Sequence, residues 1–249
     1  MKRLLLAIFI LFLFYLPIEL YSQSPTNIDE KVLLRKEYSG HILLHTNGWG
    51  IGFRRYFYRN YRKRLFVEGE FVNLKAEKEV KLQNQYFNNA KSFVYGKLYY
   101  VYPLRLGFGF RKQIHDKPYW GGLQVKYLFS GGASISFLKP YYLYVYKTII
   151  DGEVTLSEER YDPNKHYIDN IYGKGSFFKG FSEIQINPGL FGRFALNFEF
   201  GKNDSRVIAL ETGIIADFYI KPLQIMAFNE GKNFYLNLYI SFQLGRRYN

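Results

Sequence analysis

The chain has 249 residues, of which 48% are hydrophobic and 20% aromatic, with 24 Tyr, 24 Phe and no Cys. The lack of cysteine excludes disulfides, thiolate metal sites and a cysteine nucleophile. A chain of this length suits one domain. The formal net charge of +13 is compatible with binding to nucleic acid or to an anionic membrane, so the position of the charges decides between these partners.

The first 22 residues are predicted to be a secretory signal peptide. A positive start at Lys2-Arg3 precedes an almost continuously apolar run, and the sequence turns polar near Ser22. An uncleaved transmembrane helix is the alternative, but Pro17 and Glu19 interrupt the run before it reaches the length of a bilayer. We therefore predict a cleaved signal peptide at 1–22.

The first element expected after the signal is a β-hairpin. Asn47-Gly48 is a strong signal for a two-residue type I′ turn. Such a turn pairs Ile42 with Phe53 on one face and His41 with Arg54 on the other. An apolar face for lipid and a polar inner face are what a membrane-spanning hairpin requires.

The other expected strands follow from the alternation of apolar and polar residues. They lie at 65–71, 98–110, 123–137, 184–200, 207–221 and 234–245. In the last of these, Phe, Leu and Ile at even positions alternate with Tyr, Asn, Ser, Gln and Gly at odd positions. Strands of soluble sandwiches are usually about five or six residues long. Several of these runs are longer, which favours a membrane barrel.

The predicted fold class is an all-β, transmembrane, antiparallel up-and-down β-barrel of about eight strands that follows a signal peptide. The predicted outer-membrane barrel occupies 37–249, and a periplasmic segment at 23–36 joins it to the signal peptide at 1–22. The connections after the third, fifth and seventh strands are long, at 75–91, 139–179 and 222–233. The other connections are short, as expected if short periplasmic turns alternate with outer loops. One alternative is that further strands around 141–147 enter the sheet and widen the barrel.

The excess of positive charge is expected at the periplasmic end of the strands, where few acidic residues accompany it. This predicted basic rim consists of Arg59, Arg62, Lys63, Arg64, Arg111, Lys112, Lys117, Lys202, Arg206, Arg246 and Arg247. A basic ring parallel to a membrane can bind anionic headgroups. Outer-membrane lipids are therefore the expected partner of this charge, and nucleic acid is not expected behind an export signal.

The Lys-Arg start of the signal, its Ser-Gln junction, the eight alternating segments and the strand Tyr235–Leu244 together support a resemblance. The chain resembles small outer-membrane barrels of the OmpA/OmpX/OmpW type, particularly those of Bacteroidota. The resemblance covers most of the mature chain and is architectural. It implies location in the outer membrane of a Gram-negative cell.

Charged residues on the inward positions predict a charge network in the lumen. Its members are Arg54, Glu68, Glu70, Lys97, Arg105, Lys126, Arg193, Glu199, Glu211 and Asp217. The lumen of an eight-stranded barrel is only wide enough to be filled by side chains, so opposite charges are expected to pair across it. A polar plug is thus favoured over a conducting path, unless additional strands widen the barrel.

Histidine and carboxylate residues offer little support for catalysis. His41 and His45, taken with Glu68 and Glu70, suggest a hydrolase or a metal site, but neither a catalytic triad nor a metalloprotease motif surrounds the histidines. We expect no enzyme activity, cofactor or metal. The expected function is that of a structural or accessory subunit of an outer-membrane assembly or secretion complex, which contacts other envelope proteins through its outer loops or barrel wall. A small-solute channel is the alternative, and an outer-membrane lipid hydrolase is less favoured.

Overall fold

The structure is a computed structural model that describes residues 36–58, 63–87, 89–115, 122–148, 154–200 and 205–248. The predicted signal peptide at 1–22 and almost all of the segment 23–36 lie outside these residues. Among the residues described, no helix is both long and apolar enough to span a membrane.

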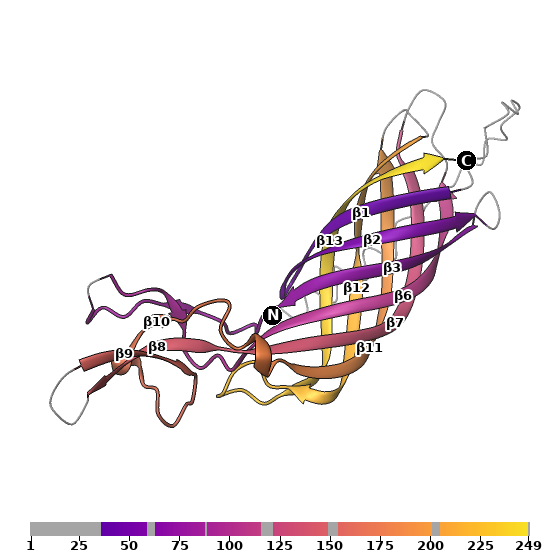
Figure 1. The fold of residues 1–249 in the computed structure, drawn as a ribbon. Helices are drawn as coiled ribbons and strands as arrows, with labels where there is room; N and C mark the ends of the chain where they lie inside the picture. The colour runs from indigo at the N-terminus through magenta and orange to yellow at the C-terminus, as the bar shows by residue number, and fades with distance from the viewer. Residues whose placement is uncertain are drawn as a thin grey trace, which may run out of the picture. The chain divides into compact units, whose positions relative to one another are not determined.

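Eight antiparallel strands of the described chain close into a barrel (Figure 1). Their order around the ring is β1-β13-β12-β11-β7-β6-β3-β2, so strands that follow one another along the chain are neighbours and β1 pairs with β13 to close the seam. The strands are β1 (Lys36–His45), β2 (Gly48–Tyr58), β3 (Lys63–Leu74), β6 (Tyr99–His115), β7 (Gln124–Pro140), β11 (Gln185–Phe200), β12 (Arg206–Leu223) and β13 (Lys232–Tyr248). The predicted all-β, up-and-down barrel of eight strands is confirmed.

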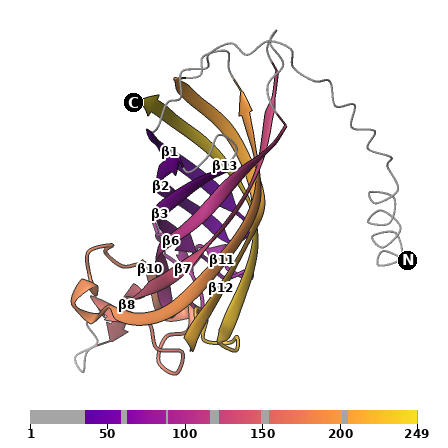
Figure 2. The same ribbon diagram turned by 90° about the vertical axis from the view of Figure 1, so that its right-hand side faces the viewer.

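The two ends of the barrel differ in their connections (Figure 2). At the turn end, where β1 begins and β13 ends, the strands are joined through 59–62, 116–123 and 201–205. At the loop end, 75–98, 141–184 and 224–231 join the strands, together with the short turn between β1 and β2. The long connections therefore gather at one end, as the sequence predicts.

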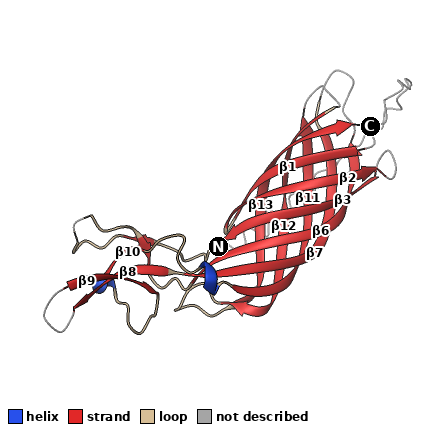
Figure 3. Ribbon diagram, in the orientation of Figure 1, coloured by secondary structure: helices blue, strands red, loops and turns tan. Residues whose placement is uncertain are grey.

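The longest connection forms a small sheet of its own at the loop end, called the loop sheet below (Figure 3). It contains β8 (Tyr142–Thr148), β9 (Val154–Arg160) and β10 (Ile171–Lys174) in the order β10-β8-β9. The short elements near it are β4 (Lys81–Leu82), β5 (Phe93–Val94) and the 3-10 helices η1 (Ile168–Asn170) and η2 (Phe181–Glu183). A strand therefore forms close to 141–147, but it pairs within the loop sheet and does not widen the barrel.

The loop sheet has its own apolar core. Phe93, Tyr141, Leu143, Val145, Tyr161 and Ile171 are buried together. The charged side chains of this region lie largely outside that core, and the ammonium group of Lys147 forms an ion pair with Glu159 at the surface. This hydrogen bond holds the pKa of the Glu159 carboxyl below its ordinary value. Burial raises the pKa of the core residue Tyr161 to about 12.

Side chains of the barrel strands alternate between the lumen and the outer surface over most of the strand length, because successive residues of a strand point to opposite faces. In β13, Leu236, Leu238 and Ile240 are exposed on the outside, whereas Asn237 and Tyr239 are buried inside. The same pattern holds in β1, where Ile42 and Leu44 face outward. Period-two alternation thus identifies the two faces correctly.

The register of the first hairpin differs from the prediction of a turn at Asn47-Gly48. Ile42 pairs with Ile51 and His41 with Gly52, so the turn consists of Thr46 and Asn47 and the pairing is shifted by two residues. Because the side-chain period of a strand is also two, this shift leaves every residue on its predicted face.

Neighbouring strands explain the shifted turn. The N–H group of Thr46 donates to the carbonyl of Leu238 in β13 at 3.0 Å, and the carbonyl of Asn47 accepts from the N–H group of Lys75 at 2.8 Å. Gly48 belongs to β2, with a φ of 151°. A Cβ atom at this glycine would lie 2.0 Å from the carbonyl oxygen of Asn73 in β3. Gly48 therefore permits close approach of two strands, which a hairpin taken by itself does not reveal.

Candidate functional site

The lumen contains nine of the ten charges predicted for it. These are Arg54, Glu68, Glu70, Arg105, Lys126, Arg193, Glu199, Glu211 and Asp217, each at most 4% exposed. Lys97 is the exception, because β6 begins only at Tyr99 and Lys97 belongs to the preceding loop. Its ammonium nitrogen lies 2.6 Å from a carboxylate oxygen of Glu79, also outside the barrel strands.

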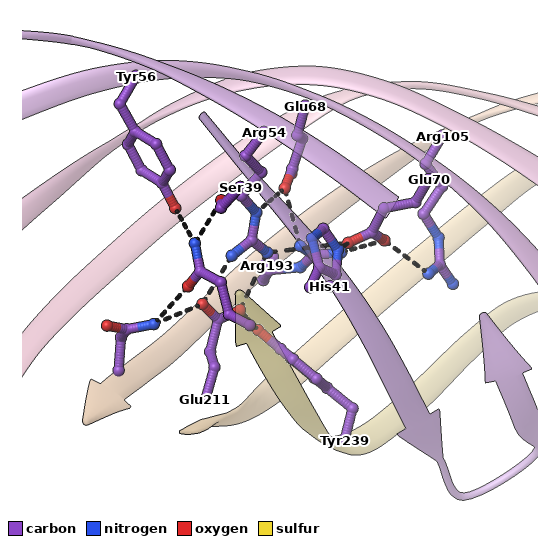
Figure 4. A network of polar contacts seen from close by, with 12 residues as sticks. Ser39, His41, Arg54, Tyr56, Glu68, Glu70, Arg105, Arg193, Glu211 and Tyr239 are labelled. Atoms are coloured by element: carbon purple, nitrogen blue, oxygen red, sulfur yellow. Dashed lines mark hydrogen bonds and ion pairs between the residues drawn. The ribbon is translucent and has the colours of Figure 1, made fainter. Parts of the chain in front are cut away.

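Arg54 on β2 connects opposite walls of the barrel (Figure 4). Its Nη1 and Nη2 atoms donate to the two carboxylate oxygens of Glu211 on β12 at 2.6 and 2.9 Å. Its Nε atom donates to Glu68 on β3 at 2.8 Å. A planar guanidinium can make such a two-point contact with one carboxylate and still bind another.

Arg193 and Arg105 extend the same network toward the loop end. Arg193 on β11 donates to Glu68 at 2.8 Å and also binds Glu70, both of which lie on β3 across the lumen. Arg105 on β6 holds Asp217 on β12 by two hydrogen bonds of 2.8 and 2.7 Å. The predicted pairing of charges across the lumen is thus present in the geometry.

Neutral side chains and one histidine complete this central network. The hydroxyl of Tyr239 donates to Glu211 at 2.6 Å, and the Nε2 atom of His41 lies 2.7 Å from Glu70 Oε1. Asn197 bridges Glu211 to Gln243, which in turn donates to Ser39 and Tyr56. Sequence reasoning did not assign roles to these amides and hydroxyls, because only alternation identifies them as inward-facing, and it does not specify their partners.

A second charged cluster occupies the lumen at the turn end. Glu37 on β1 accepts hydrogen bonds from Arg111 at 2.7 Å and from Arg247 at 2.8 Å, and it also forms an ion pair with Arg64. Arg247 also binds Glu199 on β11, which is bonded to Lys126 on β7. We name this group the turn-end cluster; its members are Glu37, Arg64, Arg111, Lys126, Glu199 and Arg247.

Three residues of the predicted basic rim belong instead to the turn-end cluster, so the prediction was wrong for them. Lys63, Lys112, Arg206 and Arg246 are exposed at the turn end, but Arg64, Arg111 and Arg247 point into the lumen. The strands extend further toward this end than their apolar residues indicate, so these three arginines continue the inward alternation of β3, β6 and β13. Arg59, Arg62, Lys117 and Lys202 lie outside the described residues.

Apolar layers fill the lumen above and between the charges. Leu43, Tyr56, Phe66, Leu128, Ala195, Ile215 and Tyr239 pack together near the central network. At the loop end a second layer contains Leu74, Val101, Leu138, Tyr219, Leu223, Ile225 and Tyr235. A pocket of about 370 Å³ opens above this second layer, and Leu223 and Tyr235 line both. Its lining residues are confined to the loop end of the barrel.

The chemistry of the lumen is that of mutual neutralisation. Removing charges from water is costly unless hydrogen-bonded partners of opposite sign replace the water. Arg54, Arg105 and Arg193 each have such partners. The Nδ1 atom of His41 is buried and has no hydrogen-bond partner among the described residues. No group of His, Asp or Glu residues in the described part of the chain has an arrangement that could hold a metal ion.

Comparisons with known proteins add little to this description. No known protein family matches the sequence, and no curated protein matches it. Among solved structures, the crystal structure of Neisserial surface protein A is similar with a TM-score of 0.38 and 9% sequence identity, over 86% of this chain and 96% of that chain. A likeness at this level carries no argument about activity, and the resemblance to barrels of Bacteroidota stays a prediction.

Proposed function

We propose that the chain is an integral outer-membrane protein. The observation that carries this proposal is the exposed apolar surface of the barrel, to which every strand contributes. Its most exposed members include Phe108 at 74% and Leu190 at 63%. Apolar areas this extensive are unfavourable in water, whereas a closed barrel leaves no unpaired sheet edge and is one of only two architectures that can span a bilayer.

The inverted distribution of side chains supports the same proposal. Arg54, Arg105 and Arg193 are buried inside the barrel while leucine, isoleucine and phenylalanine cover its outside. A soluble barrel has the opposite distribution, because its apolar residues form the core. Hydrocarbon on the outside and paired charges inside give both sets of side chains a suitable environment.

Solubility is the direct test of membrane insertion. We expect the protein to remain with membranes after washing with high salt, to require detergent for extraction and to become resistant to protease within its barrel strands when it is reconstituted in lipid vesicles. Recovery of a folded, monodisperse protein without detergent would contradict the proposal.

We further propose that the barrel does not conduct and serves as a structural or accessory subunit of an envelope complex. The filled lumen supports this role, because ion pairs and two apolar layers occupy it from the turn end to the loop end. An eight-stranded barrel has room for side chains and little else. A function that uses the barrel as an anchor for its loops fits this geometry better than passage of a solute.

Conductance in planar bilayers separates this role from that of a small-solute channel. We expect little or no steady current from the purified protein. The doubly substituted variant R54A/R193A is a useful comparison, because it removes two of the side chains that cross the centre of the lumen. A large and stable current from the unaltered protein would favour the channel instead.

The loop sheet is the surface that we propose for protein partners. It has an apolar core of its own, while Leu156, Tyr167 and Ile168 are exposed on or near it. Ordered loops with exposed aromatic residues are common in protein interfaces.

Co-purification from native membranes tests the role of the loop sheet. The double variant Y167A/I168A is expected to keep the barrel folded but to lose any co-purifying envelope protein. Lys165→Ala is the matched control, because this neighbouring side chain is also exposed but not apolar. Retention of every partner by Y167A/I168A would leave the barrel wall as the docking surface.

Hydrolysis of a lipid is the least supported role. The histidine of the central network, His41, is buried and contacts Glu70, so a substrate would have no access to it in this conformation. The non-enzymatic role therefore remains our prediction, and an assay for release of fatty acids from outer-membrane lipid is its test.

A further inference from the structure

We propose that Phe177, Phe178 and Phe181 form an anchor that inserts into the outer leaflet of the membrane beside β7 and selects lipids with anionic headgroups. These residues, called the phenylalanine cluster below, belong to the connection between β10 and β11, and Phe181 begins η2. The inference rests on the proposed membrane insertion of the barrel. It adds a lipid-binding role for a loop segment that the alternation of the strands does not reveal.

The phenylalanine cluster covers the outer surface of the barrel wall. The cluster packs over Lys139 near the end of β7. Lys139 is on the outer face of this strand, as are Phe137 and Ile135. The ammonium group of Lys139 lies 4.7 Å from the ring centre of Phe177 and 5.1 Å from that of Phe181. Lys139 is only 2% exposed because these rings lie over it.

An aromatic row connects the cluster to the wall below. Lys139 also lies 5.4 Å from the ring centre of Tyr100, its partner across the β6–β7 pairing. Tyr100 stacks with Tyr102, and Tyr102 stacks with Phe71 on β3. The phenylalanine cluster therefore continues the outward apolar surface that we propose to contact lipid, and it lies at the loop end, where aromatic residues are expected at the membrane interface.

The cluster presents its rings in a defined conformation. Phe178 is 81% exposed, although its ring contacts those of Phe177 and Phe181. Gly180 has a φ of 83°, and a Cβ atom there would lie 2.6 Å from the ring of Tyr142. The hydroxyl of Tyr142 also donates to Glu183 at the end of η2. A phenylalanine held outward by such contacts exposes apolar area that a lipid surface would cover.

Cationic side chains determine which lipid is expected. Lys174 precedes the cluster in the chain and Lys179 lies between Phe178 and Phe181; both are exposed, and Lys139 lies beneath the rings. Long lysine side chains can extend along apolar surface and leave their ammonium groups at headgroup level. Such groups near a membrane surface favour anionic lipids, so phosphate-bearing anionic lipids are the proposed ligand.

Spin labelling tests the anchor, and the absence of native cysteine makes it practicable. A nitroxide is attached to Phe178→Cys in the full chain, which is reconstituted in vesicles of phosphatidylcholine and phosphatidylglycerol. Collisions with oxygen, which concentrates in lipid, are compared with collisions with a water-soluble nickel chelate. Leu190→Cys on the outside of β11 is the lipid reference, and Tyr86→Cys, in the described outer loop and 79% exposed, is the water reference.

We expect the oxygen-to-nickel ratio at position 178 to approach that at 190 and to exceed that at 86 several-fold. A ratio equal to that at 86 would overturn the anchor, and protection from both reagents would overturn it in favour of a protein contact. If position 190 itself is accessible to nickel, the proposed membrane insertion fails instead. These results keep the two proposals distinguishable.

Two further variants test how the anchor is built. Gly180→Val in the labelled chain is expected to lower the ratio at 178, because a side chain is strained at this φ and collides with Tyr142. K174Q/K179Q is expected to lower it in vesicles that contain phosphatidylglycerol and to leave it unchanged in pure phosphatidylcholine. Equal ratios with and without the two lysines in both vesicles would contradict the selection of anionic lipid.

Discussion

The barrel and the loop sheet differ in which side chains they bury: the barrel buries charged residues, whereas the loop sheet buries apolar ones. In the barrel, Arg54 and Glu211 are buried and Leu238 is exposed; in the loop sheet, Leu143 is buried and Lys147 is exposed. Both regions are antiparallel sheets with good backbone pairing, so secondary structure does not distinguish them. The direction in which the side chains point therefore distinguishes the two regions: it suits hydrocarbon around the barrel, as proposed above, and water around the loop sheet.

The largest difference between the regions is expected for loss of an arginine. Arg193→Leu removes one cationic partner from the buried carboxylates of Glu68 and Glu70, which then keep only their contacts with Arg54, Arg105 and His41. Removing one member of a buried ion pair costs about 3–5 kcal/mol. Lys147→Leu in the loop sheet breaks an exposed pair with Glu159 and is expected to cost about 1 kcal/mol or less. Urea unfolding in detergent micelles measures both free energies, and similar losses would mean that the central network contributes nothing special to stability.

The same leucine-to-arginine change should also distinguish the two surfaces. Leu238, in the middle of β13, is 60% exposed and Leu156, on β9, is 46% exposed. An arginine facing the centre of a bilayer costs about 2–4 kcal/mol, whereas an exposed substitution in water usually changes stability by about 0.5 kcal/mol or less. Unfolding of Leu238→Arg and Leu156→Arg in lipid vesicles measures the difference. Equal unfolding midpoints would show that the outside of the barrel does not face hydrocarbon.

Removal of one methyl group is expected to destabilise the loop sheet more than the barrel. Ile171 is completely buried in the core of the loop sheet, so Ile171→Val is expected to destabilise that sheet by about 0.5–1.5 kcal/mol. Ile240→Val removes the same group from the outside of β13, where the side chain is 56% exposed, and a smaller effect is expected there. Hydrogen exchange of the β8 and barrel amides reports the two regions separately. A larger loss of stability from Ile240→Val than from Ile171→Val would contradict the assignment of Ile171 to a buried core and of Ile240 to the outer surface.

The smallest expected effect is a pH dependence of the loop sheet. The hydrogen bond from Lys147 lowers the pKa of Glu159 in the folded state. The stability that it contributes is therefore present above the ordinary carboxylate pKa of about 4.3 and is lost as the pH falls through the lower folded-state pKa. For a pair this exposed the loss is about 1 kcal/mol or less. Hydrogen exchange of β8 and β9, corrected for intrinsic rates, should show this loss in the parent chain and not in Glu159→Gln.

Alternation predicted the faces of the barrel well and its ends poorly. Residues such as Leu238 and Tyr239 fall on their expected sides because a strand has only two faces. Arg64 precedes the first apolar residue of its predicted strand and Arg247 follows the last one, so both were predicted on the rim, yet the strands extend through them. Extending the inward period to Glu37 and Arg247 would have found the turn-end cluster.

Which side chains meet across the lumen could not be predicted from periodicity. Arg54 and Glu211 are far apart in the sequence and lie on strands that are not neighbours, so their contact depends on the diameter and stagger of the closed ring. The register of the first hairpin has a similar cause, since β3 and β13 both contribute to the position of its turn. The loop sheet was missed because its strands are short and mixed in composition, and only β8 was suggested by the sequence.

The seam between β1 and β13 has a kinetic consequence. It joins Lys36 to Tyr248 at one end and His45 to Tyr239 at the other, and the Glu37–Arg247 ion pair across it links residues 210 positions apart in the chain. Contacts of such long sequence separation form slowly, and until β13 arrives the sheet has two open edges that can pair with other chains. The ring therefore cannot be completed strand by strand as the chain is synthesised. Its assembly has to wait for the final strand, and the unfinished sheet needs protection from aggregation during that interval.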